Sequence, residues 1–273
     1  MFKKVSVIIP TYNRPKVLLK SIETVINQTY PGEIEIIIID DSKKSQKKEI
    51  ESKFKSKISR KRNIKYIHHA KKKGSPYARN IGIKESTGEY IAFLDDDDEW
   101  MAEKIEEQVK ILNNDDYKNI ELCVSWILDK RFGKERINKT PNLISHKYVI
   151  DALNLQSTSA YMFRARSLKE QGGFDLELAS AQEYDLALRI SKKNPIISIP
   201  KILVIQNETK GQISENWTRK IKGIFAVRKK YKKDFSLPNH IKIFALAIAF
   251  SFGFIFGNRI YNILTYFKEV YNE

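Results

Sequence analysis

The stretch of sequence that decides the fold is Gly88-Glu89-Tyr90-Ile91-Ala92-Phe93-Leu94-Asp95-Asp96-Asp97-Asp98. Its short, uninterrupted apolar run is typical of a strand that is buried on both faces of a sheet. The run leads directly into four consecutive aspartates. Ligands of open α/β sheets bind beyond the carboxyl ends of the parallel strands, so we expect these aspartates to lie at a ligand site.

Segments on both sides of this stretch alternate between strand-like and helix-like patterns. Before it, the β-branched run from Ile34 to Ile39 ends in a second acidic pair, Asp40 and Asp41. Such alternation predicts an α/β fold, in which helices cover both faces of a mostly parallel sheet. The predicted strands are 5–10, 34–39, 64–68, 90–94, 122–128, 159–164 and 196–205, and the predicted helices are 17–26, 78–86, 99–112 and 182–192.

The chain of 273 residues is long enough for one large α/β domain and a modest appendage. We place the domain at residues 1–212 and a helical extension at 213–273. Within the domain, residues 130–155 are polar and irregular and are expected to form a loop or flap. The single cysteine, Cys123, excludes a disulfide framework and is expected to be part of the core.

The C-terminal extension is first basic and then apolar. From Arg219 to Lys233 there are eight Lys or Arg and no acid, a pattern that predicts a basic helix. The fifteen uncharged residues from Ile243 to Gly257 fall short of the roughly 20 that a membrane-spanning helix needs. We expect this segment to lie on an anionic membrane surface. Burial against the domain or against a second copy in a homodimer, and a true span, stay open.

The formal net charge of +16 is concentrated, with fourteen Lys or Arg and two acids between Lys43 and Lys73. Nucleic acid, anionic lipid and phosphorylated substrates all suit such a tract, as does plain solvation. Acidic clusters beside a phosphate backbone would cost affinity, so we expect no nucleic-acid partner and keep nucleic-acid binding as the alternative. The amino terminus shows no secretory pattern, which predicts a cytoplasmic protein.

The aspartate run itself predicts a metal site. Like charges a few ångströms apart raise each other's pKa values, and a divalent cation relieves this repulsion. Carboxylate oxygens suit Mg²⁺ or Mn²⁺, which proteins typically hold with one or two carboxylates while substrate phosphates complete the coordination shell. A nucleoside diphosphate would supply those phosphates. A solvated turn is the alternative for an acidic run taken alone.

Six motifs, in a consistent order over roughly residues 4–205, resemble glycosyltransferase family 2, an inverting family with the Rossmann-like GT-A fold. One such motif alone would be weak support, but the ordered set is specific. The motifs are Val7-Ile8-Ile9-Pro10-Thr11-Tyr12-Asn13-Arg14, Ile39-Asp40-Asp41-Ser42, Gly74-Ser75-Pro76-Tyr77-Ala78-Arg79-Asn80-Ile81-Gly82, the stretch from Gly88 to Asp98, Gly172-Gly173-Phe174-Asp175, and Gln182-Glu183-Tyr184-Asp185-Leu186.

The resemblance implies which residues bind the nucleotide sugar and the metal. The end of the first strand and the acidic pair after the second would line the nucleotide pocket. The family's Asp-x-Asp would place one carboxylate near the ribose and another on the metal, and the Ala-Arg-Asn element would be structural or contact the nucleotide. The residues implied at the nucleotide are Pro10, Tyr12, Asn13, Arg14, Asp40, Asp41, Arg79, Asp95 and Asp96, and those at the metal are Asp97 and Asp95.

The resemblance also implies a catalytic base. Inversion requires a base that takes the proton of the incoming hydroxyl while the diphosphate leaves from the opposite face. The family usually has aspartate where this chain has Glu183, and Asp185 follows two residues later. We expect Glu183 to be the base, with Asp185 as the alternative because glutamate is longer. Both acids could instead only stabilise the start of a helix.

These expectations describe a metal-dependent hexosyltransferase-type enzyme. The donor would be a nucleotide sugar, in the first place a UDP-sugar, and the cofactor Mn²⁺ or Mg²⁺. The acceptor would be lipid-linked or a growing glycan, and the protein would be peripheral to the inner face of the cell membrane. Trp100 would stack on a sugar or belong to the core. A catalytically inactive relative is a further alternative, because Glu183 departs from the family pattern.

Overall fold

The computed structural model of the protein describes residues 2–69, 71–133, 135–152, 155–208, 217–239 and 241. The strands are β1 (Val5–Thr11), β2 (Ile34–Asp40), β3 (Arg62–His68), β4 (Tyr90–Phe93), β5 (Asp98–Trp100), β6 (Leu122–Asp129), β7 (Arg136–Asn138), β8 (Leu143–Ile144), β9 (Met162–Arg164) and β10 (Ile196–Gln206). The helices are α1 (Pro15–Ile26), α2 (Lys47–Phe54), α3 (Ser75–Glu85), α4 (Lys104–Leu112), α5 (His146–Ala152), α6 (Ala165–Glu170), α7 (Gln182–Ser191) and α8 (Trp217–Lys230), with 3-10 turns η1 (Asp115–Tyr117), η2 (Arg131–Gly133) and η3 (Thr158–Ala160).

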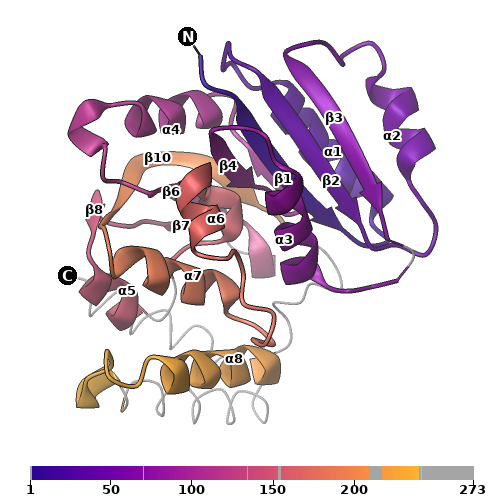
Figure 1. The fold of residues 1–273 in the computed structure, drawn as a ribbon. Coiled ribbons are helices and arrows are strands. Elements are labelled where there is room, and N and C mark those ends of the chain that lie inside the picture. Colours follow the sequence, from indigo (N-terminus) through magenta and orange to yellow (C-terminus); the bar gives the residue numbers. More distant parts are fainter. Residues whose placement is uncertain are drawn as a thin grey trace.

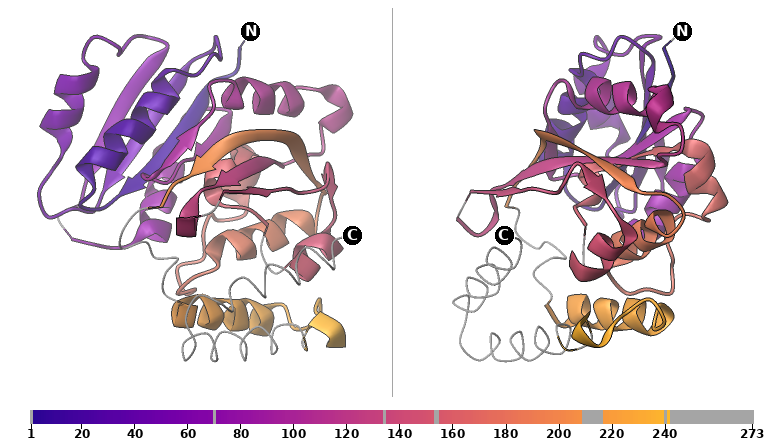
Figure 2. Two further views of the ribbon diagram at one scale, coloured as in Figure 1. Left: turned by 180° about the vertical axis from the view of Figure 1, so that it is seen from behind. Right: turned by 90° about the vertical axis from the view of Figure 1, so that its left-hand side faces the viewer.

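In the described part of the chain the strands form one sheet in the order β3-β2-β1-β4-β9-β6-β10-β5, with β7 beside β6 and β8 beside β10. Helices cover both faces (Figures 1 and 2). In Figure 1, α3 lies in front of β1 and β2, and the reverse view in Figure 2 shows α1 on the opposite face. The expected α/β fold with a helix-covered sheet is confirmed.

The first half of the sheet brings the predicted ligand-binding ends together. β3, β2, β1 and β4 are mutually parallel, and Thr11 pairs with Asp40 at the carboxyl ends of β1 and β2. β4 pairs with β1 only as far as Phe93 opposite Ile8. The residues that follow β4 therefore run alongside the last residues of β1, which places the aspartates beside Thr11.

The second half of the sheet is mixed. β9 lies between β4 and β6 and is antiparallel to both, while β10 is parallel to β6 and antiparallel to β5. The expected strand at 159–164 is shorter, because η3 occupies Thr158–Ala160 and only Met162–Arg164 pairs. The expected loop at 130–155 was also wrong in part, since it contains β7, β8 and α5.

Two helices begin where the sequence pattern alone did not place them. α3 starts at Ser75 rather than at residue 78, because Pro76 suits a first helical turn. The helix expected from residue 99 starts at Lys104, because residues 98–100 pair with β10 as β5. These starts matter because both elements border the aspartate run.

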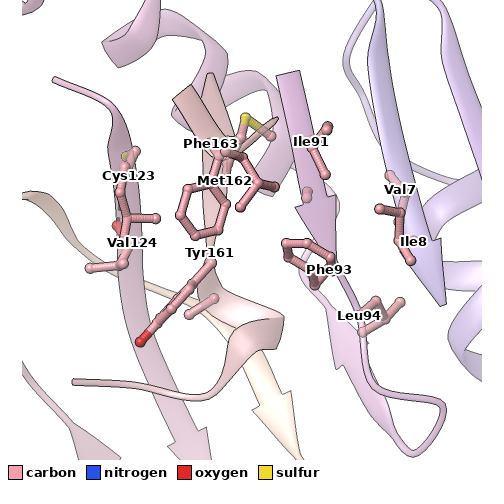
Figure 3. Close-up of a cluster of buried hydrophobic side chains, with 14 of the residues drawn as sticks. Val7, Ile8, Ile91, Phe93, Leu94, Cys123, Val124, Tyr161, Met162 and Phe163 are labelled. Atoms are coloured by element: carbon pink, nitrogen blue, oxygen red, sulfur yellow. Dashed lines mark hydrogen bonds between the residues drawn. The ribbon is translucent and has the colours of Figure 1, made fainter. Parts of the chain in front are cut away.

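The core between the two halves of the sheet is rich in aromatic side chains (Figure 3). Phe93 packs edge-to-face against Phe163 at a centroid distance of 6.0 Å and against Phe174 at 5.2 Å. Cys123 is fully buried, as expected. Because Phe174 belongs to a Gly-Gly-Phe turn, its packing on Phe93 ties that turn to the strand that ends in the aspartates.

Trp100 is part of the core, with 4% of its surface exposed. Its Nε1 donates to the backbone oxygen of Ser159 at 2.8 Å, so it is not available to stack on a sugar. The ammonium of Lys104 lies 3.9 Å from the centre of the Trp100 ring and donates to Gln108 Oε1 at 2.6 Å. A fully buried lysine thus sits behind the site without an ion-pair partner among the printed contacts of the described chain.

The C-terminal extension begins with α8, which packs against α7 below the sheet in Figure 1. The expected basic helix over 217–233 is therefore present as α8 over Trp217–Lys230, while residues 231–233 form a turn. The apolar segment 243–257 lies outside the described residues. In the part of the chain that is described, no helix combines the length and apolar character needed to cross a membrane.

Candidate active site

The acidic pair at the end of β2 is buried. Asp40 is 0% exposed, and its carboxylate accepts hydrogen bonds from the backbone N–H of Ser42 and the hydroxyl of Tyr66. The side chain of Ser42 in turn accepts a bond from the backbone N–H of Asn13 at 2.7 Å. Asp40 therefore shapes the end of β2 and holds it against the residues that follow β1.

Asp41 holds the loop that leads into α3. Its Oδ2 accepts the backbone N–H groups of Lys73 and Gly74, both at 2.9 Å, and its Oδ1 lies 3.2 Å from His69 Nδ1. The same loop carries Lys72, whose ammonium lies 4.1 Å from the centre of the Tyr12 ring. The wall of the predicted nucleotide pocket is thus lined with aromatic and cationic groups, a combination suited to a base and its phosphates.

Two of the four aspartates after β4 form close ion pairs with arginines. Arg79 on α3 donates to Asp95 Oδ1 at 2.5 Å, and Arg14, directly before α1, donates from NH1 to Asp97 Oδ2 at 2.8 Å. The Asp95 side chain is 30% exposed, against 10% for Asp97. Asp95 is therefore the more open of the two to a ligand. Each arginine also brings a cation to the place where a diphosphate would have to lie.

The other two aspartates face hydroxyl groups and are buried. Thr11 donates to Asp96 Oδ2 at 2.7 Å, and Ser159 donates to Asp98 Oδ2 at 2.6 Å. Ser159 Oγ also lies 3.1 Å from the backbone nitrogen of Asp95. These contacts fix the path of the run, and Asp96 Oδ1 in addition lies 3.4 Å from Arg14 NH1.

The buried pair resists ionisation. Burial, together with the neighbouring carboxylates Asp97 and Asp95, raises the pKa of Asp96 to about 6, although the hydrogen bond from Thr11 and the nearby Arg14 act in the opposite direction. Burial and the same neighbours raise the pKa of Asp98 well above its usual range. A corner in which carboxyl groups crowd one another in this way favours an additional cation.

The residues present fit a divalent metal that shares its coordination with a ligand. In the described chain, no group of three or more His, Cys, Asp or Glu side chains is arranged to hold a metal ion. Asp95 and Asp97 could supply one or two hard oxygen ligands, which is what Mg²⁺ takes from proteins when phosphates complete its shell. Arg79 Nε, which is buried without a hydrogen-bond partner, lies on the side chain that contacts Asp95.

Backbone strain coincides with the site. Two non-glycine residues in the described chain have a positive φ, Asn13 at 55° and Ala181 at 61°. Asn13 directly precedes Arg14, and Ala181 is the N-cap of α7, two residues before Glu183. A left-handed conformation costs free energy and persists where the surrounding structure imposes it, often at functional sites. A left-handed residue thus lies next to the predicted nucleotide-binding residue Arg14, and another lies close to the predicted base Glu183.

Asn80 connects the α3 motif to the Gly-Gly-Phe turn. Its Nδ2 donates to the backbone oxygen of Phe174, and its Oδ1 accepts the Phe174 N–H, both at 2.8 Å. Gly173 has a φ of 69°, and a Cβ there would lie 2.5 Å from Asn80 Oδ1. Asn80 is therefore structural, and the turn it holds leads along the chain toward α7.

Glu183 and Asp185 occupy the first turn of α7 but differ in environment. Glu183 is half-buried and accepts no hydrogen bond that the structure records among the described residues. Asp185 is 0% exposed, and Arg189, Lys230 and Tyr231 all donate to its carboxylate. Asp185 has the environment of an anchor, whereas Glu183 has the environment of a group that can meet a substrate.

The structure gathers most of the predicted site residues into one connected cluster. Several members that complete it were not singled out from the sequence, because their roles depend on contacts across the sheet. Thr11 lies inside a quoted motif, Ser159 was expected in a strand, and the basic tracts gave no reason to choose Lys72 or Lys230. The predicted residues that the contacts above link together are Asn13, Arg14, Asp40, Asp41, Arg79, Asp95, Asp96 and Asp97, while Pro10 and Tyr12 lie on the same segment after β1.

Comparisons with known proteins identify glycosyltransferases as similar to this chain. The model of the family described as Glycosyl transferase family 2 matches residues 6–171. An uncharacterized glycosyltransferase of Methanocaldococcus jannaschii is 30% identical over 68% of this chain and 63% of its own length. The Escherichia coli UDP-Glc:alpha-D-GlcNAc-diphosphoundecaprenol beta-1,3-glucosyltransferase WfaP is 31% identical over 59% of this chain and 61% of its own. The chain thus spans less than two thirds of these relatives, and only 16% of a Rickettsia bellii glycosyltransferase.

Solved structures share the fold. S. aureus TarS in complex with UDP-GlcNAc has a TM-score of 0.64 and 21% identity, covering 78% of this chain and 61% of TarS. The mannosyltransferase PcManGT of Pyrobaculum calidifontis, in complex with GDP-Man and Mn²⁺, has a TM-score of 0.68 and 15% identity, covering 100% and 81%. At these identities the likeness concerns the GT-A fold alone. With the family match over more than half of its length, the chain belongs to glycosyltransferase family 2.

Proposed function

We propose that the protein transfers a sugar from a nucleotide sugar, a UDP-sugar in the first place, to a hydroxyl of a lipid-linked or growing glycan acceptor, with inversion. The observation that carries this proposal is the corner after β4. There Asp95 and Asp97 face Arg79 and Arg14, and two further carboxyl groups are buried behind them. In such a cluster the carboxylates can bind a cation and the arginines can bind phosphates, so the cluster suits a ligand that brings both.

In this proposal the two acidic regions divide the chemistry. Asp95 and Asp97 would hold Mn²⁺ or Mg²⁺, which when bound stabilises the negative charge of the departing diphosphate. Arg14 and Arg79 would turn from the aspartates to the phosphate oxygens, a geometry that guanidinium groups favour. Glu183 would accept the proton of the acceptor hydroxyl while its oxygen forms a bond to the anomeric carbon and the bond to the diphosphate breaks.

The nature of donor and acceptor rests on similar proteins. TarS was solved with UDP-GlcNAc and PcManGT with GDP-Man and Mn²⁺, and the name of WfaP specifies UDP-Glc as donor and a diphosphoundecaprenol-linked sugar as acceptor. A lipid diphosphate acceptor would place the protein at the cytoplasmic face of a membrane. The exposed lysines Lys222, Lys232 and Lys233 support such a position, because each basic residue near an anionic surface adds roughly 1 kcal/mol of attraction.

A donor screen by ligand-induced thermal shift tests the proposed function. With Mn²⁺ present, one class of nucleotide or nucleotide sugar should raise the unfolding temperature of the wild-type protein. The shift should vanish in Asp97→Ala and persist in Asp116→Ala, which removes an exposed aspartate on η1 far along the chain. Equal shifts in wild type and Asp97→Ala would remove the metal assignment.

Membrane association has its own test. The full-length chain should co-sediment with phosphatidylglycerol vesicles and not with phosphatidylcholine vesicles, and the binding should weaken as salt is added. Replacing the exposed lysines Lys222, Lys232 and Lys233 with glutamine should reduce it. Equal recovery of wild type and variant with anionic vesicles would argue against a peripheral position governed by this surface.

A further inference from the structure

One ammonium group joins two family motifs. Lys230 Nζ, at the end of α8, donates to Asp175 Oδ2 and to Asp185 Oδ1, each at 2.7 Å. Asp175 ends the Gly-Gly-Phe-Asp turn, and Asp185 lies in the first turn of α7. The segment between these carboxylates is thereby closed by a residue from the C-terminal extension, which lies outside the residues 6–171 that the family model matches.

The carboxylate of Asp185 is saturated by donors. Tyr231 donates to the same oxygen as Lys230 at 2.8 Å, and Arg189 donates from Nε to the other oxygen at 2.9 Å. Burial alone would lower the pKa of Lys230, but its hydrogen bonds to Asp175 and Asp185 outweigh burial and raise it. Lys230 itself is 38% exposed, whereas Asp185 is fully buried, so the pair is desolvated on the side of α7. Removing one partner of such a pair costs more than breaking a surface pair, because the remaining carboxylate stays buried without compensation.

The other end of α8 holds the same segment. Arg219 Nε donates to the backbone oxygen of Ala179 at 2.7 Å, and the hydroxyl of Ser180 donates to the backbone oxygen of Arg219 at 2.7 Å. At Gly223 the helix backbone approaches so closely that a Cβ would lie 2.1 Å from Ser180 Oγ and 2.6 Å from its backbone oxygen. Arg219, Gly223 and Lys230, which are spread along α8, therefore all contact residues 175–185.

The segment that α8 holds is the one that aims Glu183. It contains Ala181 in the left-handed conformation and leads directly into the turn from which Glu183 projects. Gln182 donates to the backbone oxygen of Leu178 at 2.6 Å, and the N–H of Asp185 bonds to the Ala181 oxygen at 3.0 Å. A strained N-cap of this kind persists only if its neighbours are fixed, and the neighbours on both sides are fixed by α8.

We propose that Lys230 and Tyr231 are positioning residues, which clamp Asp175 and Asp185 so that the first turn of α7 presents Glu183 to the acceptor hydroxyl. The clamp makes the basic C-terminal helix a part of the catalytic apparatus rather than an appendage. This proposal rests on the proposed role of Glu183. Displacing a catalytic base by about 1 Å can lower the rate on the order of a hundredfold. A small shift of the first turn of α7 after loss of the clamp would therefore be measurable as a loss of activity.

The test compares Lys230→Met with the matched control Lys229→Met, which removes an exposed lysine from the same turn of α8, and with the conservative Lys230→Arg. Lys230→Met should lower kcat by about 10- to 100-fold with the donor KM unchanged. Lys230→Arg should recover part of the loss, and Lys229→Met should behave as wild type. If Lys230→Met lowers only the unfolding temperature and leaves kcat as it was, the residue is an anchor and the proposal is overturned.

A second readout does not depend on activity. Amide hydrogen exchange of residues 176–183 should become faster in Lys230→Met while exchange in β1 and β2 stays the same, and Lys229→Met should show no change. Unchanged exchange in this segment would overturn the clamp even if the enzyme were active. If the wild type transfers no sugar while exchange responds as expected, the proposed function fails and the clamp stands as a structural feature only.

Discussion

Arg14 NH1 lies 2.8 Å from Asp97 Oδ2 and 3.4 Å from Asp96 Oδ1, so one guanidinium group contacts two consecutive carboxylates of the aspartate run. Arg14 follows the strained Asn13 directly, and its side chain is 24% exposed. If the proposed metal binds Asp97, it would replace Arg14 as the partner of this carboxylate, and Arg14 would be released to contact the phosphates.

This exchange predicts opposite effects on two ligands. Arg14→Met should strengthen the binding of Mn²⁺ alone, because it removes a cation that competes for Asp97, and should weaken the binding of a nucleoside diphosphate, because it removes a charge-assisted hydrogen-bond donor worth about 1.5–3 kcal/mol. Titration calorimetry with each ligand measures both. Lys16→Met, an exposed change of equal charge on α1, controls for net charge. Weaker Mn²⁺ binding in Arg14→Met would show that the two cations do not compete.

Substitution of Glu183 should affect the rate of transfer, whereas substitution of Asp185 should affect the stability of the fold. Glu183→Gln should reduce transfer by about 10²- to 10⁴-fold, the usual contribution of a general base, and leave thermal stability and donor binding unchanged. Asp185→Asn should lower the free energy of unfolding by roughly 1–3 kcal/mol, because it leaves Arg189 and the partly exposed Lys230 without their charged partner. Rate assays with unfolding curves distinguish the two. An inactive but fully stable Asp185→Asn enzyme would move the base to Asp185.

The Gly-Gly turn offers a matched pair of substitutions. Gly172 and Gly173 both have a positive φ, 73° and 69°, but a Cβ at Gly172 meets nothing within 4 Å, whereas one at Gly173 meets Asn80 Oδ1 at 2.5 Å. Gly172→Ala should therefore cost only the backbone strain, about 1–2 kcal/mol. Gly173→Ala should cost about 1–3 kcal/mol more, because Asn80 must release a buried peptide group of Phe174. Equal losses in urea unfolding would mean that Asn80 does not hold the turn.

Lys104 predicts a dependence of stability on pH. Burial lowers the pKa of its ammonium from 10.5 to about 7. Between these two pH values the unfolded chain binds more protons than the folded protein. The free energy of unfolding therefore decreases as the pH falls from 10.5 to 7, because the buried Lys104 must then carry a charge. Lys104→Met should stabilise the protein by about 1–4 kcal/mol at pH 6, and by much less near pH 10. Urea unfolding at both pH values checks this, with the exposed Lys110→Met as control. A gain that is the same at both pH values would contradict the assignment.

Much of the fold could be predicted because its decisive elements carry local signals. Ile34–Asp40 is apolar apart from Glu35 and its last residue, and Tyr90–Phe93 is wholly apolar and leads through Leu94 to the aspartates. Both proved to be buried parallel strands whose ends meet at one edge of the sheet. The antiparallel strands β5, β7, β8 and β9 are only two or three residues long. Strands this short have no period of their own, and they form because a neighbouring strand offers a hydrogen-bonding edge.

The candidate site likewise contains residues that the sequence identifies and residues that only the fold reveals. Residues inside motifs, such as Asp95 and Arg79, could be named from the sequence because their spacing is local. Their partners could not, since Ser159 reaches Asp98 across 61 residues and Lys230 reaches Asp185 across 45. A serine in a strand-like segment and a lysine in a basic tract carry no mark that sets them apart until the fold brings them to a buried carboxylate.

Anomalous diffraction from crystals soaked with Mn²⁺ and UDP tests most directly whether the end of β4 holds a metal-bound nucleotide. We predict a manganese peak in contact with a carboxylate oxygen of Asp95 or Asp97 and with oxygens of both phosphates, while Arg14 has left Asp97. A bound UDP whose phosphates are held by Arg14 and Arg79 with no manganese peak at this corner, or a peak elsewhere in the molecule, would contradict it.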